Sequence, residues 1–126
     1  MPARENPPWR ILVIEDEPMI SIDVQDILLD AGFQIAGVAA RLDKALHLIE
    51  HAVFDAALVD ANLAGESATP AAEALTTRGV PFIVLSGYSP EQQPQELRAA
   101  PFIAKPCQSS RLVEMLNSVL QKTGNA

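Results

Sequence analysis

Five polar residues whose side chains can do chemistry stand directly after short apolar runs of the chain. They are Glu15, Asp16, Asp60, Ser86 and Lys105. Three carboxylates gathered in one place would repel one another strongly unless a cation lay among them. A ligand set made only of oxygen atoms, with no matching His or Cys, suits a hard ion such as Mg²⁺, which is typically held by one or two carboxylates. The pattern therefore predicts a magnesium site.

Asp60 is the candidate nucleophile of this set. Aspartate is one of the side chains that can carry a phosphoryl group covalently. Phosphoryl transfer also requires a metal ion and hydrogen-bond donors for the equatorial oxygens of the phosphoryl group. A serine hydroxyl and a lysine can supply those donors, so we expect Asp60 to accept a phosphoryl group with Ser86 and Lys105 beside it.

Each of these residues also has an ordinary structural explanation. An Asp at the end of a strand is commonly a turn former or a helix cap, which applies to both Asp16 and Asp60. The pair Ser86-Gly87 could form a plain turn, and Lys105 could be a surface residue at a strand exit. The coincidence of such residues at several strand ends favours the functional interpretation.

The elements that must position these residues alternate between two hydrophobic periods. Apolar runs predict strands at 11–14, 35–39, 56–59, 81–85 and 102–104. Helical spacing marks 18–31, 42–49, 69–78 and 112–120, while Pro90 and Pro94 allow only a short or irregular helix within 89–100. This alternation predicts right-handed βαβ units and a parallel sheet with helices on both faces. Ligands of such sheets bind beyond the carboxyl ends of the strands, where the polar residues would meet.

The composition bounds the class of protein. A chain of 126 residues with 48% hydrophobic residues and a mean hydropathy of +0.13 is one cored domain. A net charge of −7 argues against nucleic-acid binding, which depends on neutralising phosphates. No apolar run approaches the ~20 residues of a membrane helix. The N-terminus does not resemble a secretory signal, and the single Cys107 excludes an internal disulfide, so we expect a cytoplasmic protein.

The ordered set of motifs resembles the receiver domain of bacterial two-component response regulators. ILVIEDEP resembles its first strand with the acidic pair, ALVDANL its phosphoacceptor strand, and AKP its lysine and following proline. The resemblance covers residues 10–121 and implies a flavodoxin-like three-layer α/β sandwich with five parallel strands in the order 2-1-3-4-5. Residues 1–9 and 122–126 are then expected to be flexible tails.

The resemblance also implies a role for each site residue. The phosphorylated residue would be Asp60. The residues implied to hold Mg²⁺ are Asp16, Asp60, Asn62 through its backbone carbonyl, and Glu15 through water. The groups implied to hold the phosphoryl oxygens are Ser86, the Gly87 amide and Lys105, with Asn62 beside them.

A switch is implied as well. Phosphorylation would draw the Ser86 hydroxyl inward, and Phe102 on the fifth strand would rotate into the vacated space. One new local charge would thus select between two packings. The surface around Tyr88 and Phe102 is the expected docking site of a downstream protein partner.

A narrower resemblance lies in residues 81–88, PFIVLSGY. They resemble the segment that defines a stand-alone subfamily common in alphaproteobacteria, called FAT GUY. The matching residues are Pro81, Phe82, Gly87 and Tyr88, whereas Val84, Leu85 and Ser86 replace the usual Phe, Ala and Thr.

The chain departs from the common receiver pattern elsewhere. Ala64 stands where many receivers carry proline, and Cys107 where an aromatic residue is frequent. A cis bond between Lys105 and Pro106 is expected from the family, although an arbitrary X-Pro bond is cis only ~5–6% of the time.

These observations predict a single-domain response regulator that takes a phosphoryl group from a sensor histidine kinase or a histidine phosphotransfer protein. It would signal through a changed surface as a monomer or weak dimer, and would not be an enzyme beyond assisting its own phosphorylation and dephosphorylation. The alternatives are a constitutive interaction module with the receiver fold, a phosphate sink, or the receiver end of a hybrid kinase. A nucleotide- or flavin-binding domain is disfavoured, because the loop at 15–18 is acidic and lacks glycine.

Overall fold

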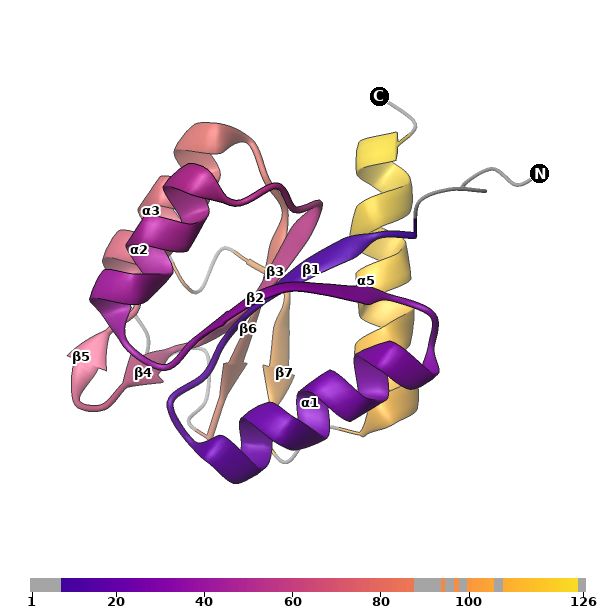
Figure 1. Cartoon of the computed structure of the whole chain (residues 1–126), viewed down its shortest axis with the longest axis horizontal. Coiled ribbons are helices and arrows are strands. Elements are labelled where there is room, and N and C mark those ends of the chain that lie inside the picture. The colour runs from indigo at the N-terminus through magenta and orange to yellow at the C-terminus, as the bar shows by residue number, and fades with distance from the viewer. Residues whose placement is uncertain (1–7, 88–93, 95–96, 98–99, 106–107, 125–126) are drawn as a thin grey trace.

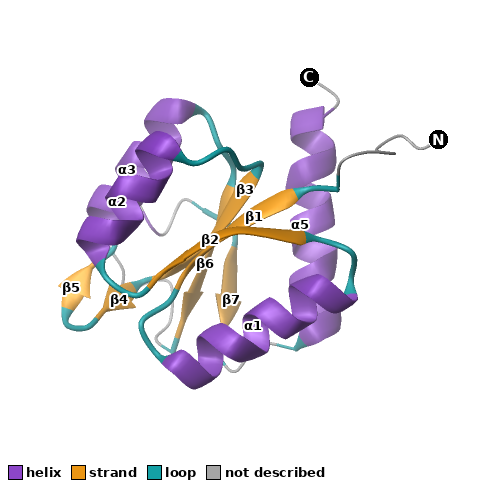
Figure 2. Cartoon of the chain, in the orientation of Figure 1, coloured by secondary structure: helices purple, strands orange, loops and turns teal. Residues whose placement is uncertain are grey.

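A five-stranded parallel sheet forms the middle layer of the molecule (Figures 1 and 2). The computed structural model describes residues 8–87, 94, 97, 100–105 and 108–124. The sheet strands are β1 (Arg10–Ile14), β2 (Gln34–Ala39), β3 (Ala56–Asp60), β6 (Phe82–Ser86) and β7 (Phe102–Ala104). They lie in the order β2-β1-β3-β6-β7, and each neighbouring pair is parallel.

Helices cover both faces of this sheet. The helices of the described residues are α1 (Pro18–Asp30), α2 (Leu42–His51), α3 (Thr69–Arg78) and α5 (Ser109–Gly124). Figure 1 shows α1 and α5 on one face and α2 and α3 on the other, which confirms the three-layer α/β prediction. No helix in the described part of the chain is long and apolar enough to cross a membrane.

The predicted numbering of the strands needs one correction. Between β3 and α3 the chain forms two further strands, β4 (Asn62–Leu63) and β5 (Glu66–Ser67), which pair antiparallel outside the main sheet. The last two sheet strands are therefore the sixth and seventh along the chain, not the fourth and fifth. The extra pair was not expected because two-residue strands are too short to show a hydrophobic period.

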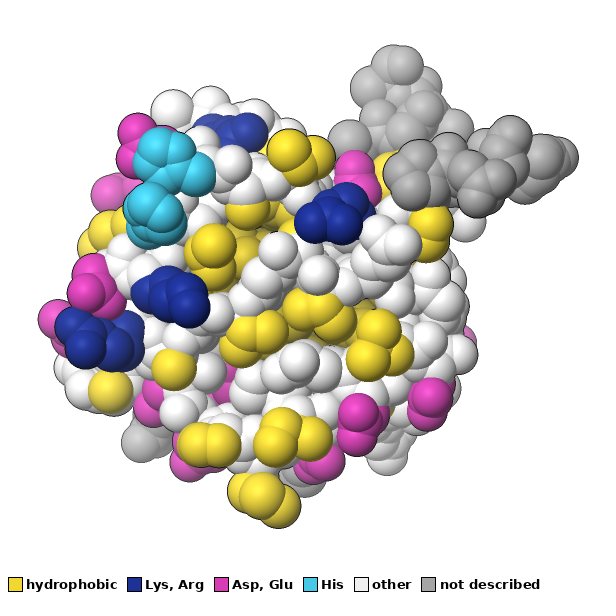
Figure 3. All heavy atoms as spheres, in the orientation of Figure 1, with side chains coloured by type: hydrophobic (Ala, Val, Ile, Leu, Met, Phe, Trp, Pro, Cys, Tyr) yellow, Lys and Arg dark blue, Asp and Glu magenta, His cyan; other side chains and the backbone are white. Residues whose placement is uncertain are grey.

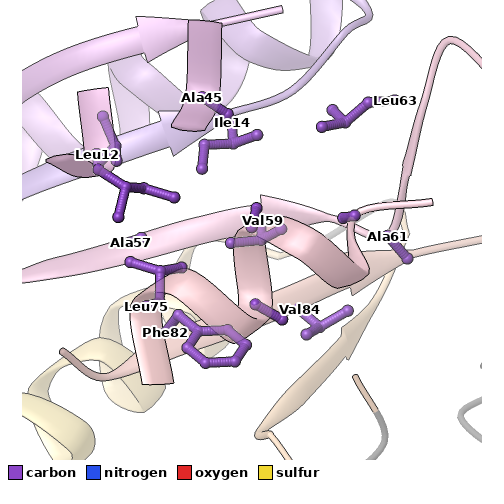
Figure 4. Close-up of a cluster of buried hydrophobic side chains, with 14 of the residues drawn as sticks. Leu12, Ile14, Ala45, Ala57, Val59, Ala61, Leu63, Leu75, Phe82 and Val84 are labelled. Carbon is purple, nitrogen blue, oxygen red and sulfur yellow. The ribbon is translucent and has the colours of Figure 1, made fainter. Parts of the chain in front are cut away.

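The core lies in two clusters, one on each face of the sheet. Successive strand residues point to opposite faces, so Leu12 and Ile14 of β1 enter the cluster under α2 and α3, while Ile11 and Val13 enter the cluster under α1 and α5. Figure 4 shows the first cluster, in which side chains from several strands and helices meet. Because β1, β3 and β6 are buried on both faces, they read as continuous apolar runs in the sequence.

Helix ends follow the expected local signals. Pro18 occupies the first turn of α1, where its missing N–H costs no hydrogen bond. Gly79 ends α3 with a φ of 73°, a left-handed conformation that a residue with a Cβ adopts only with strain.

The inner residues of both predicted tails belong to the folded domain. Trp9 packs against the cluster under α1 and α5, and its carbonyl accepts a hydrogen bond from the Gln34 N–H at 2.9 Å. Helix α5 continues to Gly124, because Gly124 is the first helix-breaking residue after Leu120. The predicted irregular helix at 89–100 lies mostly outside the described residues. As Figure 1 shows, β1 begins and α5 ends at the same edge of the sheet.

Candidate functional site

Three carboxylates meet at the carboxyl edge of the sheet. Glu15 and Asp16 follow β1, and Asp60 ends the neighbouring strand β3. Each offers an oxygen that lies within 4.8 Å of the others, in a group that we call the acidic cluster. Glu15 and Asp60 are buried, and Asp16 is half-buried. The adjacency of β1 and β3 therefore creates the concentration of charge that the sequence predicted.

Lys105 extends over this edge from the end of β7. Its Nζ lies 3.0 Å from Oε1 of Glu15 and 3.2 Å from Oδ2 of Asp60. Its own backbone N–H donates to the Ser86 carbonyl at 2.9 Å, which fixes the lysine to the end of β6. Burial disfavours the charged ammonium, but the hydrogen bond with Glu15 and the negative charge of Asp60 raise the pKa of Lys105 above its ordinary value. The site thus holds a lysine that is charged at neutral pH.

Backbone amides hold each carboxylate of the acidic cluster. The Glu17 N–H donates to Oε2 of Glu15 (3.1 Å). In the same way, the Asn62 N–H donates to Oδ1 of Asp60 (3.2 Å) and the Ala64 N–H to Oδ2 of Asp16 (3.0 Å). Because these donors are parts of the main chain, they constrain the carboxylates more than mobile side chains would.

The cluster carries more negative charge than Lys105 neutralises. Burial, together with contacts from Asp16 and Glu15, raises the pKa of Asp60 to about 8. Partial burial works in the same direction on Asp16, but hydrogen bonds with Asp60 and from the Ala64 N–H lower its pKa below the ordinary value. One carboxyl of the pair therefore retains its proton near neutral pH when no further cation is present.

The donor set fits a hard cation. All three side chains present oxygen atoms, the ligands that Mg²⁺ prefers. Oε1 of Glu15 is buried and, among the described residues, accepts no hydrogen bond, although it lies within ion-pair distance of Lys105. A cation or its bound water would satisfy this oxygen, and its positive charge would offset the burial and the neighbouring carboxylates that raise the pKa of Asp60.

A surface cavity of about 470 Å³ opens over the acidic cluster. Its lining consists of Asp16, Glu17, Asp60, Asn62, Ser86, Gly87 and Lys105. The structure thus brings together residues predicted from four strand ends, with the buried Glu15 below them. Asp60 lies in the wall of a space large enough for a small anion.

Other predicted residues lie outside this cavity. Phe102 begins β7, pairs with Val84 and packs half-buried against the cluster under α2 and α3. Tyr88, Pro106 and Cys107 fall outside the described residues, so the predictions made for them stay predictions. His47 and His51 are exposed on α2.

Sequence reasoning missed the backbone donors at Glu17 and Ala64. A backbone N–H has no side-chain signature, so nothing in the residue types at these positions indicates a contact with a carboxylate. The one available signal was the departure at Ala64 from the proline that many receivers carry.

Comparison with known proteins identifies the family. Residues 11–117 match the response regulator receiver domain. The chain belongs to this family. This receiver therefore shares the family's general character: a domain of two-component signalling whose members interact with kinases or phosphotransfer proteins and generally bind Mg²⁺ at an acidic site.

Individual relatives are distant. The transcriptional regulatory protein PdtaR of Mycobacterium tuberculosis is 25% identical over 119 residues, which are 91% of this receiver and 58% of PdtaR. The receiver thus spans a little over half the length of that relative. The solution structure of SdrG from Sphingomonas melonis Fr1 is 33% identical, covers 90% of this chain and 97% of that one, and has a TM-score of 0.79.

Two further solved structures are similar. The BeF3-activated conformation of SdrG from Pseudomonas melonis Fr1 is 33% identical, covers 88% of this receiver and 95% of that chain, and has a TM-score of 0.76. The PhyR response regulator REC domain of Erythrobacter litoralis is 31% identical, with 90% of each chain covered and a TM-score of 0.78. The FAT GUY subfamily is not confirmed by these similarities and stays a prediction.

Proposed function

We propose that this receiver accepts a phosphoryl group on Asp60 from a phosphohistidine of a sensor kinase or phosphotransfer protein. One observation carries the proposal: Asp60 is the carboxylate that lies in the cavity wall, 3.2 Å from Lys105 and within 4.8 Å of two other carboxylates. This arrangement supports the proposal, because phosphoryl transfer requires a nucleophile, a cation and anion-binding groups around one space. The similarity to SdrG, which has a BeF3-activated conformation, supports the same interpretation.

The transfer step exchanges one bond for another. An oxygen of the Asp60 carboxylate attacks the phosphorus, a P–O bond forms, and the P–N bond of the donor histidine breaks. The electron pair of that bond stays on the ring nitrogen, which takes up a proton. Asp60 must be ionised to attack, and its raised pKa means that a cation is needed to ionise it fully near neutral pH.

The groups around Asp60 have separate roles in this proposal. Mg²⁺ would be held by Asp16, Asp60 and the carbonyl of Asn62, with Glu15 acting through water. When bound, it supplies positive charge to the carboxylates and to the phosphoryl oxygens. Lys105, Ser86 and Gly87 line the same cavity. The ammonium group, the hydroxyl and the backbone N–H of these residues would contact the transferred group as charge develops on its oxygens. The chain acts as a switch that holds its one product, not as an enzyme that releases it.

The signal would leave through the end of β6 and through β7. Ser86 is buried at the end of β6, and its carbonyl accepts a hydrogen bond from the Lys105 N–H. A phosphoryl group would pull the side chains of Ser86 and Lys105 toward the cavity. This movement would change the space beside Phe102, which is half-buried at the start of β7. The surface near Phe102 and Tyr88 is the proposed docking site of a downstream protein.

The phosphodonor protein has a different candidate surface. Large hydrophobic side chains of α1 are exposed at Met19 (74%), Ile22 (54%) and Leu29 (55%). Figure 3 shows hydrophobic side chains along the lower edge of the view, where Figure 1 places α1. Beside this helix, a second cavity of about 370 Å³ shares Glu17 and Lys105 with the cavity over Asp60. A partner seated on α1 would therefore lie next to the nucleophile.

A small phosphodonor tests the proposal without any partner protein. The receiver is incubated with Mg²⁺ and acetyl phosphate, and the mass gain is mapped by peptide mass spectrometry. We expect one phosphoryl group on Asp60, no gain in Asp60→Asn, and an unchanged gain in Asp26→Asn, which alters an exposed carboxylate of α1. Absence of the gain, under conditions where another receiver reacts, would exclude the proposal and favour a constitutive interaction module.

A further inference from the structure

The antiparallel pair β4-β5 forms a hairpin, residues 62–67, whose turn holds an alanine in a left-handed conformation. Its strands pair Asn62 with Ser67 and Leu63 with Glu66. The two turn residues, Ala64 and Gly65, have φ angles of 53° and 90°. Two positive φ angles are typical of the tight turns that suit hairpins. Among the described residues, Ala64 is the one with a Cβ that adopts this left-handed conformation, which is unfavourable for such residues.

The strained turn aims a backbone donor at the acidic cluster. The N–H groups of the two turn residues take no part in the pairing of the strands. The Ala64 N–H donates to Oδ2 of Asp16 at 3.0 Å, although 48 positions separate these residues. The Gly65 N–H donates to Oδ1 of Asn62 at 2.9 Å, which closes the turn. Both N–H groups of the turn therefore donate to side-chain oxygens rather than to the opposite strand.

The same hairpin holds a second carboxylate of the cluster. The Asn62 N–H donates to Oδ1 of Asp60 at 3.2 Å. Leu63, between these two donors, is fully buried in the cluster under α2 and α3, as Figure 4 shows, and anchors the hairpin to the domain. Two donors spaced two residues apart thus bind carboxylates that come from the ends of two different strands.

We infer that Ala64 is a positioning residue of the phosphoacceptor site. The hairpin, anchored by Leu63, fixes Asp16 and Asp60 relative to each other, and leaves their remaining oxygens to bind a cation. A proline at position 64 could do neither part of this, since it has no N–H and its φ is locked near −65°. The cation-binding part of this inference rests on the proposed function, whereas the contact between Ala64 and Asp16 does not.

Amide hydrogen exchange tests the contact in the metal-free receiver, without phosphodonor. We expect the Ala64 amide to be protected in the native receiver and in Asp16→Asn, which keeps an acceptor oxygen, and to exchange at least ~10-fold faster in Asp16→Ala. The Gly65 amide, bonded to Asn62, serves as the internal control and should keep its protection in all three proteins. Equal exchange of the Ala64 amide in Asp16→Asn and Asp16→Ala would overturn the inference.

Magnesium affinity, measured by calorimetry, tests the positioning role. We expect Ala64→Gly to bind Mg²⁺ within ~2-fold of the native receiver, because it keeps the N–H and relieves strain. Ala64→Pro should bind at least ~10-fold more weakly, since a hydrogen bond to a charged group is lost. Gly65→Ala strains the same turn but keeps the Ala64 N–H, so its affinity should stay within ~2-fold even if its stability falls.

The outcomes separate the two proposals. Native affinity in Ala64→Pro, or equal losses in Gly65→Ala and Ala64→Pro, would show that the hairpin has only a structural role. If even the native receiver bound no Mg²⁺, the Mg²⁺-dependent mechanism of the proposed function would be excluded. The exchange experiment would still decide whether the Ala64 N–H holds Asp16.

Discussion

Lys105 lies against Asp60 across the edge of the sheet, with 3.2 Å between Nζ and Oδ2. The same ammonium group lies 3.0 Å from Oε1 of the buried Glu15. The ammonium group of Lys105 therefore contacts two buried carboxyl groups. An oxygen of Asp16 lies within 4.8 Å of an oxygen of each. This excess of negative charge determines how the stability of the receiver responds to mutation, pH and Mg²⁺.

Removal of the lysine charge should destabilise the receiver. Lys105→Met keeps the apolar stem but leaves Glu15 without its ion partner, and we expect a loss of ~1–3 kcal/mol in the free energy of unfolding at neutral pH. Lys105→Arg keeps the charge and should lose less. Urea denaturation gives the values, with the exposed Lys44→Met expected within ~0.5 kcal/mol of native as a control. Similar stabilities for Met and Arg at position 105 would show that the ion pair contributes nothing.

The stability of the metal-free receiver should fall as pH rises. The pKa of Asp60 is raised from 3.8 to about 8 in the folded state, so between these values the folded protein holds a proton that the unfolded chain has lost. This contribution is complete below the lower value and is lost as pH passes the higher one. Asp60→Asn removes the titration, so it should be more stable than the native receiver above pH ~8, by ~1–3 kcal/mol.

Denaturation in the presence of a chelator, at several pH values across this range, measures the difference between the two proteins. Lys105 stays protonated throughout because its own pKa is raised. Parallel pH profiles for the native receiver and Asp60→Asn would contradict the assignment of the high pKa to Asp60.

Magnesium should stabilise the native receiver. A ligand that binds only the folded state adds ~2.7 kcal/mol at a concentration 100 times its Kd. The gain should be largest above pH ~8, where no proton competes for Asp60. Asp16→Asn should lose most of it, whereas Asp26→Asn, on the exposed side of α1, should keep it. Thermal unfolding with and without Mg²⁺ measures the gain, and an equal gain in both variants would place the ion elsewhere.

The exposed face of α1 should be needed for transfer from a protein but not from a small donor. Ile22→Glu puts a charge into the proposed docking surface, and we expect at least a ~10-fold slower transfer from a phosphorylated histidine protein. The rate with acetyl phosphate should be unchanged. Val53→Glu is the matched control, because Val53 is 77% exposed and lies between α2 and β3. Equal slowing by both variants would exclude α1 as the donor's docking site.

The parallel sheet, and the meeting of the site residues at one of its edges, could be predicted because both follow from where the strands end. Each buried strand is a continuous apolar run, so its last residue marks the carboxyl edge. Lys105 and Glu15 are 90 positions apart, yet a parallel sheet brings their strands to the same edge. Local patterns together with one rule of topology were therefore sufficient for this part.

The hairpin and the packing of Trp9 could not be predicted in this way. The strands at 62–63 and 66–67 are too short for a period, and Ala64 has no residue type that indicates its contact with Asp16. Trp9 stands outside any apolar run, so its packing on the core depends on tertiary contacts alone.

The shared location of the first residue of β1 and the end of α5 has a practical consequence for experiments. Strand β1 runs toward Asp60 and its five residues span ~17 Å, while α5 runs back from Lys105 to the opposite edge. A fluorophore, an affinity handle or a surface linkage attached beside Arg10 or at the last turn of α5 would therefore lie at the edge of the sheet opposite the phosphoacceptor. The start of β1 and the end of α5 therefore offer attachment points that leave the reactive edge open to donor and effector proteins.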